Sequence, residues 1–71
     1  MNKIYVLEFA DSGNYCAYAT FDKAKQILWE SYCDEVDADI RARHYEEDIK
    51  TLEEGYIIDY GYVDEVTFVE E

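Results

Sequence analysis

Near its start the chain reads Lys3-Ile4-Tyr5-Val6-Leu7-Glu8-Phe9-Ala10, then Asp11-Ser12-Gly13-Asn14, then Tyr15-Cys16-Ala17-Tyr18-Ala19-Thr20-Phe21. The two outer segments have the residue types and spacing of β-strands, and the middle segment collects turn-forming residues. This pattern predicts a β-hairpin over residues 1–21. The first segment is apolar on both faces, so we expect that strand to be covered on both sides or to lie centrally in a sheet.

From Asp22 the spacing of apolar residues becomes helical, and Asp22 itself is a plausible N-cap. Acidic residues between 34 and 39 interrupt the pattern, which resumes until Gly55, a natural residue to follow a helix end. We predict helices over 22–34 and 38–54, joined by a sharp bend. One unbroken helix over 22–54 would be ~50 Å long, which is long for a domain of this size, and it ranks second. The two predicted apolar stripes are Ala24, Ile27, Leu28, Tyr32 and Cys33, with Trp29 beside them, and Ala38, Ala42, Tyr45, Ile49 and Leu52.

Residues 56–69 return to strand character, with a turn or bulge predicted at Gly61 or at Asp64-Glu65. The order β-β-α-α-β-β predicts an α+β fold: an antiparallel sheet of about four strands with two helices packed on one face. The chain of 71 residues is too short for a second core, so we expect residues 1–71 to form a single domain.

The charge of the chain is lopsided. Its 18 acidic and 6 basic residues give a net charge of −12. Residues 1–33 hold four acids and three bases, and residues 34–71 hold fourteen acids and three bases, so −11 of the total lies in the second half. This balance argues strongly against a protein that binds nucleic acid or an anionic membrane, because both need a basic surface.

Motifs for catalysis or metal binding are weak. His44 is the only histidine and has no recognisable nucleophile near it, and Asp37-Ala38-Asp39 begins like a calcium loop but meets Ala42 where glycine is required. Cys16 and Cys33 form no CxxC pair, so we expect two free thiols packed as small hydrophobes. We therefore predict no enzyme activity, no metal site and no cofactor.

The compartment is predicted from the N-terminus. Glu8 interrupts the first apolar run, which is too short for a signal peptide or a membrane span. We therefore expect a cytoplasmic protein.

The acids of the second half follow two patterns. Some fall at the i,i+4 spacing of salt-paired helix surface, as Glu46→Lys50, Arg43/Glu47 and Lys50/Glu54 do. Glu53-Glu54, by contrast, end a helix whose C-terminal dipole disfavours negative charge. The choice between solubility and partner binding as the reason for these acids stays open.

Tyrosine, with eight copies, is the second unusual feature of the composition. Exposed tyrosines among carboxylates would suit a basic protein groove, with carboxylates in the place of phosphates and rings in the place of sugars or bases. A straight helix over 38–54 would be ~25 Å long, which matches about 7 base pairs of duplex. The predicted partner-binding residues are Glu46, Glu47, Glu53, Glu54, Asp59, Tyr60, Tyr62, Asp64 and Glu65.

Three segments resemble those of small acidic proteins encoded by bacteriophages and prophages: Met1-Asn2-Lys3-Ile4-Tyr5-Val6-Leu7, Phe21-Asp22-Lys23-Ala24 and Gly55-Tyr56-Ile57-Ile58-Asp59-Tyr60-Gly61-Tyr62. That class includes inhibitors of host defence nucleases, among them anti-restriction and anti-CRISPR proteins, some of which mimic DNA. The resemblance implies a small inhibitor in the cytoplasm of a bacterial host and transfers no catalytic residue.

The leading hypothesis is an inhibitor that occupies the basic groove of a host nucleic-acid-processing enzyme. The first alternative is an adaptor that binds a host protein through an exposed sheet edge, with acidity serving solubility. A nucleotide sponge would need more cations than the chain has. A homodimer is compatible with each hypothesis, since a two-layer domain leaves one sheet face to cover.

Overall fold

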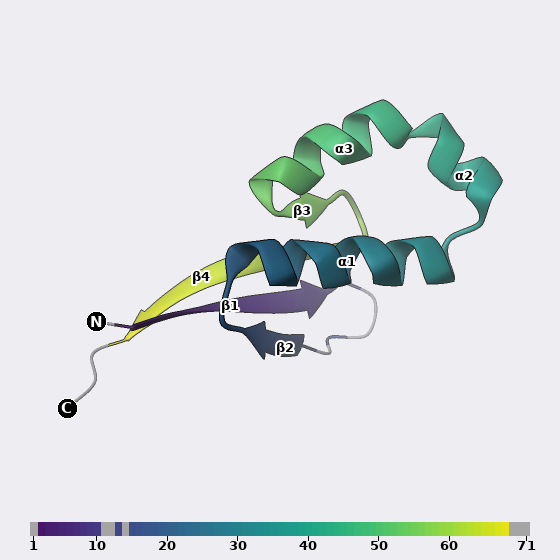
Figure 1. The fold of residues 1–71 in the computed structure, drawn as a ribbon. Helices are drawn as coiled ribbons and strands as arrows, with labels where there is room; N and C mark the ends of the chain where they lie inside the picture. Colours follow the sequence, from purple (N-terminus) through teal and green to yellow (C-terminus); the bar gives the residue numbers. More distant parts are fainter. Residues whose placement is uncertain (1, 11–12, 14, 69–71) are drawn as a thin grey trace.

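The computed structural model describes residues 2–10, 13 and 15–68. Its strands form one antiparallel sheet in the order β2-β1-β4-β3 (Figure 1). The α+β class and the four-stranded antiparallel sheet are therefore confirmed. The elements are β1 (Asn2–Phe9), β2 (Tyr15–Tyr18), α1 (Phe21–Glu35), α2 (Ala38–Arg43), α3 (Tyr45–Glu54), β3 (Tyr56–Ile57) and β4 (Gly61–Phe68).

The two strands of the predicted N-terminal hairpin are present and paired, although β2 ends at Tyr18 because Thr20 and Phe21 begin α1. Three residues of the predicted turn, Asp11, Ser12 and Asn14, lie outside the described residues. Strand β1 is central as expected, paired with β2 on one side and along its whole length with β4 on the other.

Of the two places predicted for a turn or bulge, Asp64-Glu65 is wrong, since β4 runs unbroken through both residues, and Gly61 directly follows the turn at residues 58–60. The side chains of Asp64 and Glu65 are exposed, and a strand tolerates such residues when they alternate to opposite faces. The chain turns instead between β3 and β4, where Asp59 adopts a left-handed φ of 61°, a conformation that aspartate tolerates better than most residues.

The core lies between α1 and the sheet. Leu7 of β1, Leu28 of α1 and Ile57 of β3 are almost fully buried, each contributing about 1.5–3 kcal/mol of hydrophobic stabilisation. Gly61 opens β4 at a point of close approach, because a Cβ there would lie 2.8 Å from the carbonyl oxygen of Glu8 and 3.1 Å from Cδ1 of Leu28. A glycine at this position lets the two central strands and α1 come together.

Helix α1 begins one residue earlier than predicted. Its N-cap is Thr20, whose Oγ1 accepts a hydrogen bond from the backbone N–H of Lys23 at 3.1 Å. The prediction of Asp22 as the cap is therefore wrong; Asp22 lies in the first turn and pairs with Lys25 at 3.6 Å. The apolar stripe of this helix is confirmed, with Ala24, Leu28 and Tyr32 buried.

The second predicted helix is two helices, α2 and α3, separated at His44 (Figure 1). His44 leaves the helical conformation, with φ −117° and ψ 10°. The predicted stripe does not hold a straight helix together, because Ala38, Ala42 and Tyr45 are all exposed and most helical stability comes from packing of an apolar face. The break therefore falls within a stretch, residues 42–47, in which every side chain is exposed.

Contacts of different kinds hold α2 and α3 to the rest of the fold. Arg41 Nε donates to the carbonyl oxygen of Val36 at 2.9 Å, which ties α2 back to the C-cap of α1. Helix α3 packs against β3 and α1 and ends at Gly55, which takes a left-handed φ of 99° as predicted for a residue after a helix end.

Candidate functional site

The acids of α3 lie at its two ends. Because the helix begins after His44, Glu46 and Glu47 fall in its first turn, and Glu53 and Glu54 fall in its last turn, which has no basic residue. All four side chains are exposed. The helix dipole favours acids at the N-terminus and disfavours them at the C-terminus. Local stability therefore explains Glu46 and Glu47 but leaves Glu53 and Glu54 unexplained.

The predicted salt pairs of this helix are absent. Within the part of the chain that the structure describes, the ion pairs are Lys3–Glu65 at 3.1 Å and Asp22–Lys25 at 3.6 Å. The pairs predicted for Lys50 fail because exposed ion pairs gain little over solvation, and Arg43 lies in α2, across the break from Glu47. The α3 carboxylates are thus left without a neutralising cation.

Tyr60 is not the exposed contact residue that the sequence predicted. Its ring packs 5.2 Å from that of Tyr32 and 5.7 Å from that of Phe9, centroid to centroid. Its hydroxyl donates to Oε2 of Glu35 at 2.8 Å. The side chain is half-buried and joins the turn before β4 to the end of α1.

Tyr62 is exposed as predicted and lies on the face of the sheet that α1 leaves open. Its hydroxyl donates to Oε2 of Glu8 on the neighbouring strand β1. This hydrogen bond to a carboxylate raises the pKa of Tyr62 above its usual value. Alternation along β4 puts Asp64 on the same face as Tyr62, while Glu65 lies on the opposite face, where it pairs with Lys3.

The nine predicted partner-binding residues therefore do not form one patch. Tyr62 and Asp64 share the open sheet face, and Glu65 and Tyr60 do not. The fold brings Glu47 and Asp59 together at a cavity of about 320 Å³. This cavity lies where α1, α2, α3 and the β3–β4 turn meet, and its lining is Tyr32, Ile40, His44, Glu47, Asp48, Ile58 and Asp59.

One residue of this cavity was missed from the sequence: Asp48, which is only 4% exposed. Its Oδ2 accepts a hydrogen bond of 2.6 Å from the hydroxyl of Tyr32. Burial, reinforced by this bond, raises the pKa of Tyr32 to about 12. The sequence contains one signal for the burial of Asp48, because Asp48, Thr51, Leu52 and Gly55 fall at helical spacing. The predicted apolar stripe left Asp48 out because the residue is charged.

The cysteines and acids supply no visible centre for chemistry in the described residues. Cys16 and Cys33 are both free thiols. The prediction of core packing is wrong for Cys16, which is exposed because β2 is an edge strand. In residues 2–10, 13 and 15–68, no three His, Cys, Asp or Glu side chains gather as a metal site would require.

Comparison with known proteins finds no match to any family model, curated protein or solved structure. None of the described helices has the length and apolar character needed to cross a membrane.

Proposed function

We propose that this chain is a phage-type protein inhibitor, not an enzyme, that occupies the basic, nucleic-acid-binding groove of a bacterial host defence enzyme such as a CRISPR nuclease. The observation that carries the proposal is the set of exposed carboxylates without ion pairs: among the described acids, only Asp22 and Glu65 lie within 4.0 Å of a cation. Such a field attracts a basic surface and speeds encounter with it.

The shape of the acidic surface limits how mimicry of nucleic acid could work. Helix α3 has 10 residues and is therefore ~15 Å long, which corresponds to about 4 base pairs. The track of ~25 Å expected from one long helix does not exist. A partner groove would instead meet acids from several elements of a molecule that measures 49 × 23 × 15 Å.

An adaptor function is the second candidate, favoured by one observation. The sheet order leaves β2 at one edge, and its residues Tyr15, Cys16 and Ala17 are exposed. An extended segment of a host protein could add to this edge through backbone hydrogen bonds. Affinity of that kind would hardly change with salt, whereas the inhibitor function predicts a steep loss of affinity as salt rises.

Displacement of DNA tests the inhibitor function. Fluorescently labelled duplex DNA is bound to each of a panel of purified bacterial nucleases, CRISPR and restriction enzymes among them, and the protein is titrated in. We expect it to displace DNA from at least one enzyme, with a midpoint that rises with salt. No displacement from any enzyme of the panel, or displacement unaffected by salt, would contradict the proposal.

A matched pair of variants locates the effect. The double change Glu53→Gln with Glu54→Gln removes two charges from the α3 C-terminus, and Asp22→Asn with Glu30→Gln removes two exposed charges from α1. Only the first is expected to weaken displacement, by roughly tenfold if two charged contacts of about 0.7 kcal/mol each are lost.

A further inference from the structure

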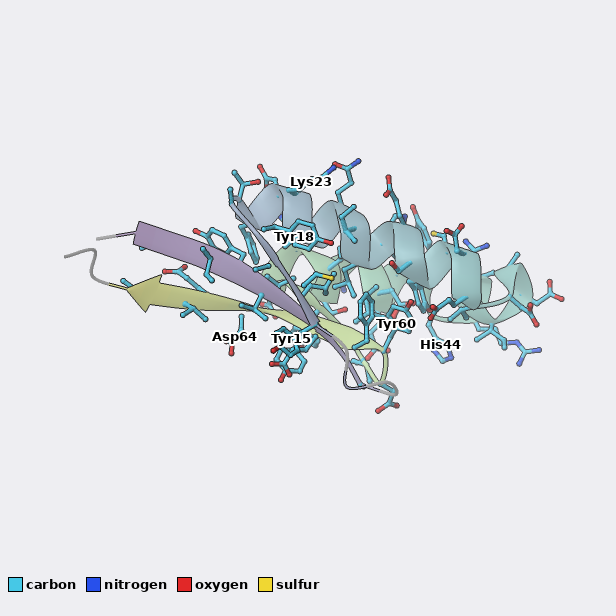
Figure 2. All side chains as sticks on the ribbon, turned by 90° about the horizontal axis from the view of Figure 1, so that it is seen from below. Tyr15, Tyr18, Lys23, His44, Tyr60 and Asp64 are labelled. Atoms are coloured by element: carbon cyan, nitrogen blue, oxygen red, sulfur yellow. The ribbon has the colours of Figure 1, made fainter. Side chains whose placement is uncertain are left out.

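The sheet has one face without a covering layer in the described structure. Leu7 of β1 points to α1 and is fully buried, and its neighbours Val6 and Glu8 therefore point to the opposite face. In Figure 2, Tyr15 and Asp64 lie on the side of the sheet away from α1, whereas Tyr18 lies between the sheet and α1. This second side is called the open face below.

Strand register aligns three tyrosines and a glutamate in one row across the open face. Tyr15 of β2 pairs with Glu8 of β1, Glu8 with Tyr62 of β4, and Tyr62 with Tyr56 of β3. The row thus crosses all four strands. Tyr15, Tyr62 and Tyr56 are 71%, 44% and 37% exposed, although tyrosine rings in a sheet are stabilised when other side chains pack over them.

The charged side chains on the described strand residues of the open face are acidic: Glu8 and Asp64. Next to the tyrosine row, Val6 pairs with Asp64, and beyond them Ile4 pairs with Val66. Among the described strand residues, Lys3 is the only basic one, and it lies on the α1 side of the sheet with Glu65. Glu8 and Asp64 therefore have no strand cation beside them on their own face.

We propose that the open face is a docking surface for an arginine-bearing segment of a protein partner, with guanidinium groups stacked on Tyr15 and Tyr62 and paired with Glu8 and Asp64. Arginine matches both halves of this surface, since its planar group stacks on aromatic rings and binds carboxylates through two parallel hydrogen bonds. Tyr62 holds Glu8 by its hydroxyl, so that carboxylate is positioned before a partner arrives. A second copy of the chain is disfavoured, because face-to-face packing would bring acids against acids. The identity of the partner as a basic host enzyme rests on the proposed function.

Titration with short basic peptides, followed by amide NMR of the whole chain, tests the surface. The probe is a synthetic peptide of alternating arginine and glycine, compared with peptides of the same length carrying lysine or glutamate in place of arginine. We expect shifts centred on β1, β2 and β4, with affinity in the order arginine, lysine, glutamate. Shifts centred on α3, or equal affinity for the arginine and lysine peptides, would overturn the proposal.

Tyrosine variants supply the matched control. Tyr15→Thr with Tyr62→Thr removes both rings and puts in their place a β-branched residue that strands accept, and it should weaken binding of the arginine peptide roughly tenfold. Tyr45→Thr removes a tyrosine of α3 that is 54% exposed and whose ring lies 6.3 Å from that of Trp29 on α1, and this change should alter affinity less than twofold. If the double variant does not fold, Tyr15→Thr alone must weaken binding at least twofold, because that ring is the most exposed of the row. Equal binding by the variants, or dimerisation through this face in sedimentation, would overturn the proposal.

The DNA-displacement assay separates the surface from the proposed function. If the tyrosine double variant displaces DNA as the unmodified protein does, the docking surface is wrong and the inhibitor function stands. If no nuclease releases DNA but the arginine peptide still maps to the open face, the inhibitor function is wrong and the surface stands.

Discussion

The hydrogen bond between Tyr32 and Asp48 links two helices through buried side chains. The two residues are 16 positions apart, and their bond joins α1 to α3 in the interior. A buried carboxylate is costly unless it is hydrogen-bonded, and the Tyr32 hydroxyl supplies a donor to it. Losing that donor would therefore leave one buried oxygen, Oδ2 of Asp48, without this hydrogen bond.

Tyr32→Phe is expected to destabilise the protein by about 1–3 kcal/mol, because it leaves a buried acceptor without its donor. Urea unfolding at neutral pH measures the change. Tyr45→Phe serves as the control, since the Tyr45 side chain is exposed and its substitution should have little effect. An unchanged midpoint for Tyr32→Phe would mean that the bond contributes no net stability.

The same tyrosine predicts a pH dependence. The pKa of Tyr32 is raised from 10.0 to about 12 in the folded chain. The stability that this residue contributes is therefore fully present below pH 10 and is lost as the pH rises towards 12. The unfolded chain loses its proton first, which favours unfolding in that window. The unmodified protein should therefore lose more stability between pH 10 and 12 than Tyr32→Phe does, with parallel curves as the contradicting result.

Helix α3 is the element in which stability and charge are most clearly opposed. Its first turn contains three acids and its last turn ends in Glu53 and Glu54. Replacing the last two by glutamine should raise the free energy of unfolding by about 0.3–1 kcal/mol per charge. The variant with Glu46 and Glu47 replaced by glutamine should have a lower free energy of unfolding than this C-terminal variant, although each variant loses two negative charges.

Thermal unfolding of the two glutamine variants at equal salt compares the ends of α3 directly. If the C-terminal variant is the less stable of the two, Glu53 and Glu54 stabilise the fold and the conflict between stability and function disappears. If it gains stability while losing DNA displacement, those acids are kept for binding.

At the scale of the whole molecule, a net charge of −12 on 71 residues repels itself. Salt shortens the range of this repulsion, with a Debye length of ~10 Å at 0.1 M and ~3 Å at 1 M. The unfolding midpoint should therefore rise with sodium chloride over this range, measured by thermal denaturation followed by circular dichroism. The rise should be smaller in a variant with Glu46, Glu47, Glu53 and Glu54 all replaced by glutamine. A midpoint that falls with salt would mean that ion pairs outweigh repulsion.

Part of the site was predictable and part was not. The sequence pointed to Glu53 and Glu54 because their conflict with the helix dipole is local and visible in one turn. The sequence could not show that Tyr60 is half-buried while Tyr62 is exposed, because the contact of Tyr60 with Tyr32 joins residues that are 28 positions apart. Tyr15 and Glu8 were not singled out, because their row with Tyr62 exists only through strand register.

By itself the sequence determined the hairpin, the first helix and its buried stripe, the end of α3 at Gly55 and the concentration of charge in the second half. Each follows from residues near one another in the chain, through periodicity, turn chemistry and charge. Only the tertiary structure decided the break at His44, the burial of Asp48 and the face on which each acid of β4 lies. These depend on pairing and packing between distant segments, where a change of one residue in register would move every side chain of a strand to the other face.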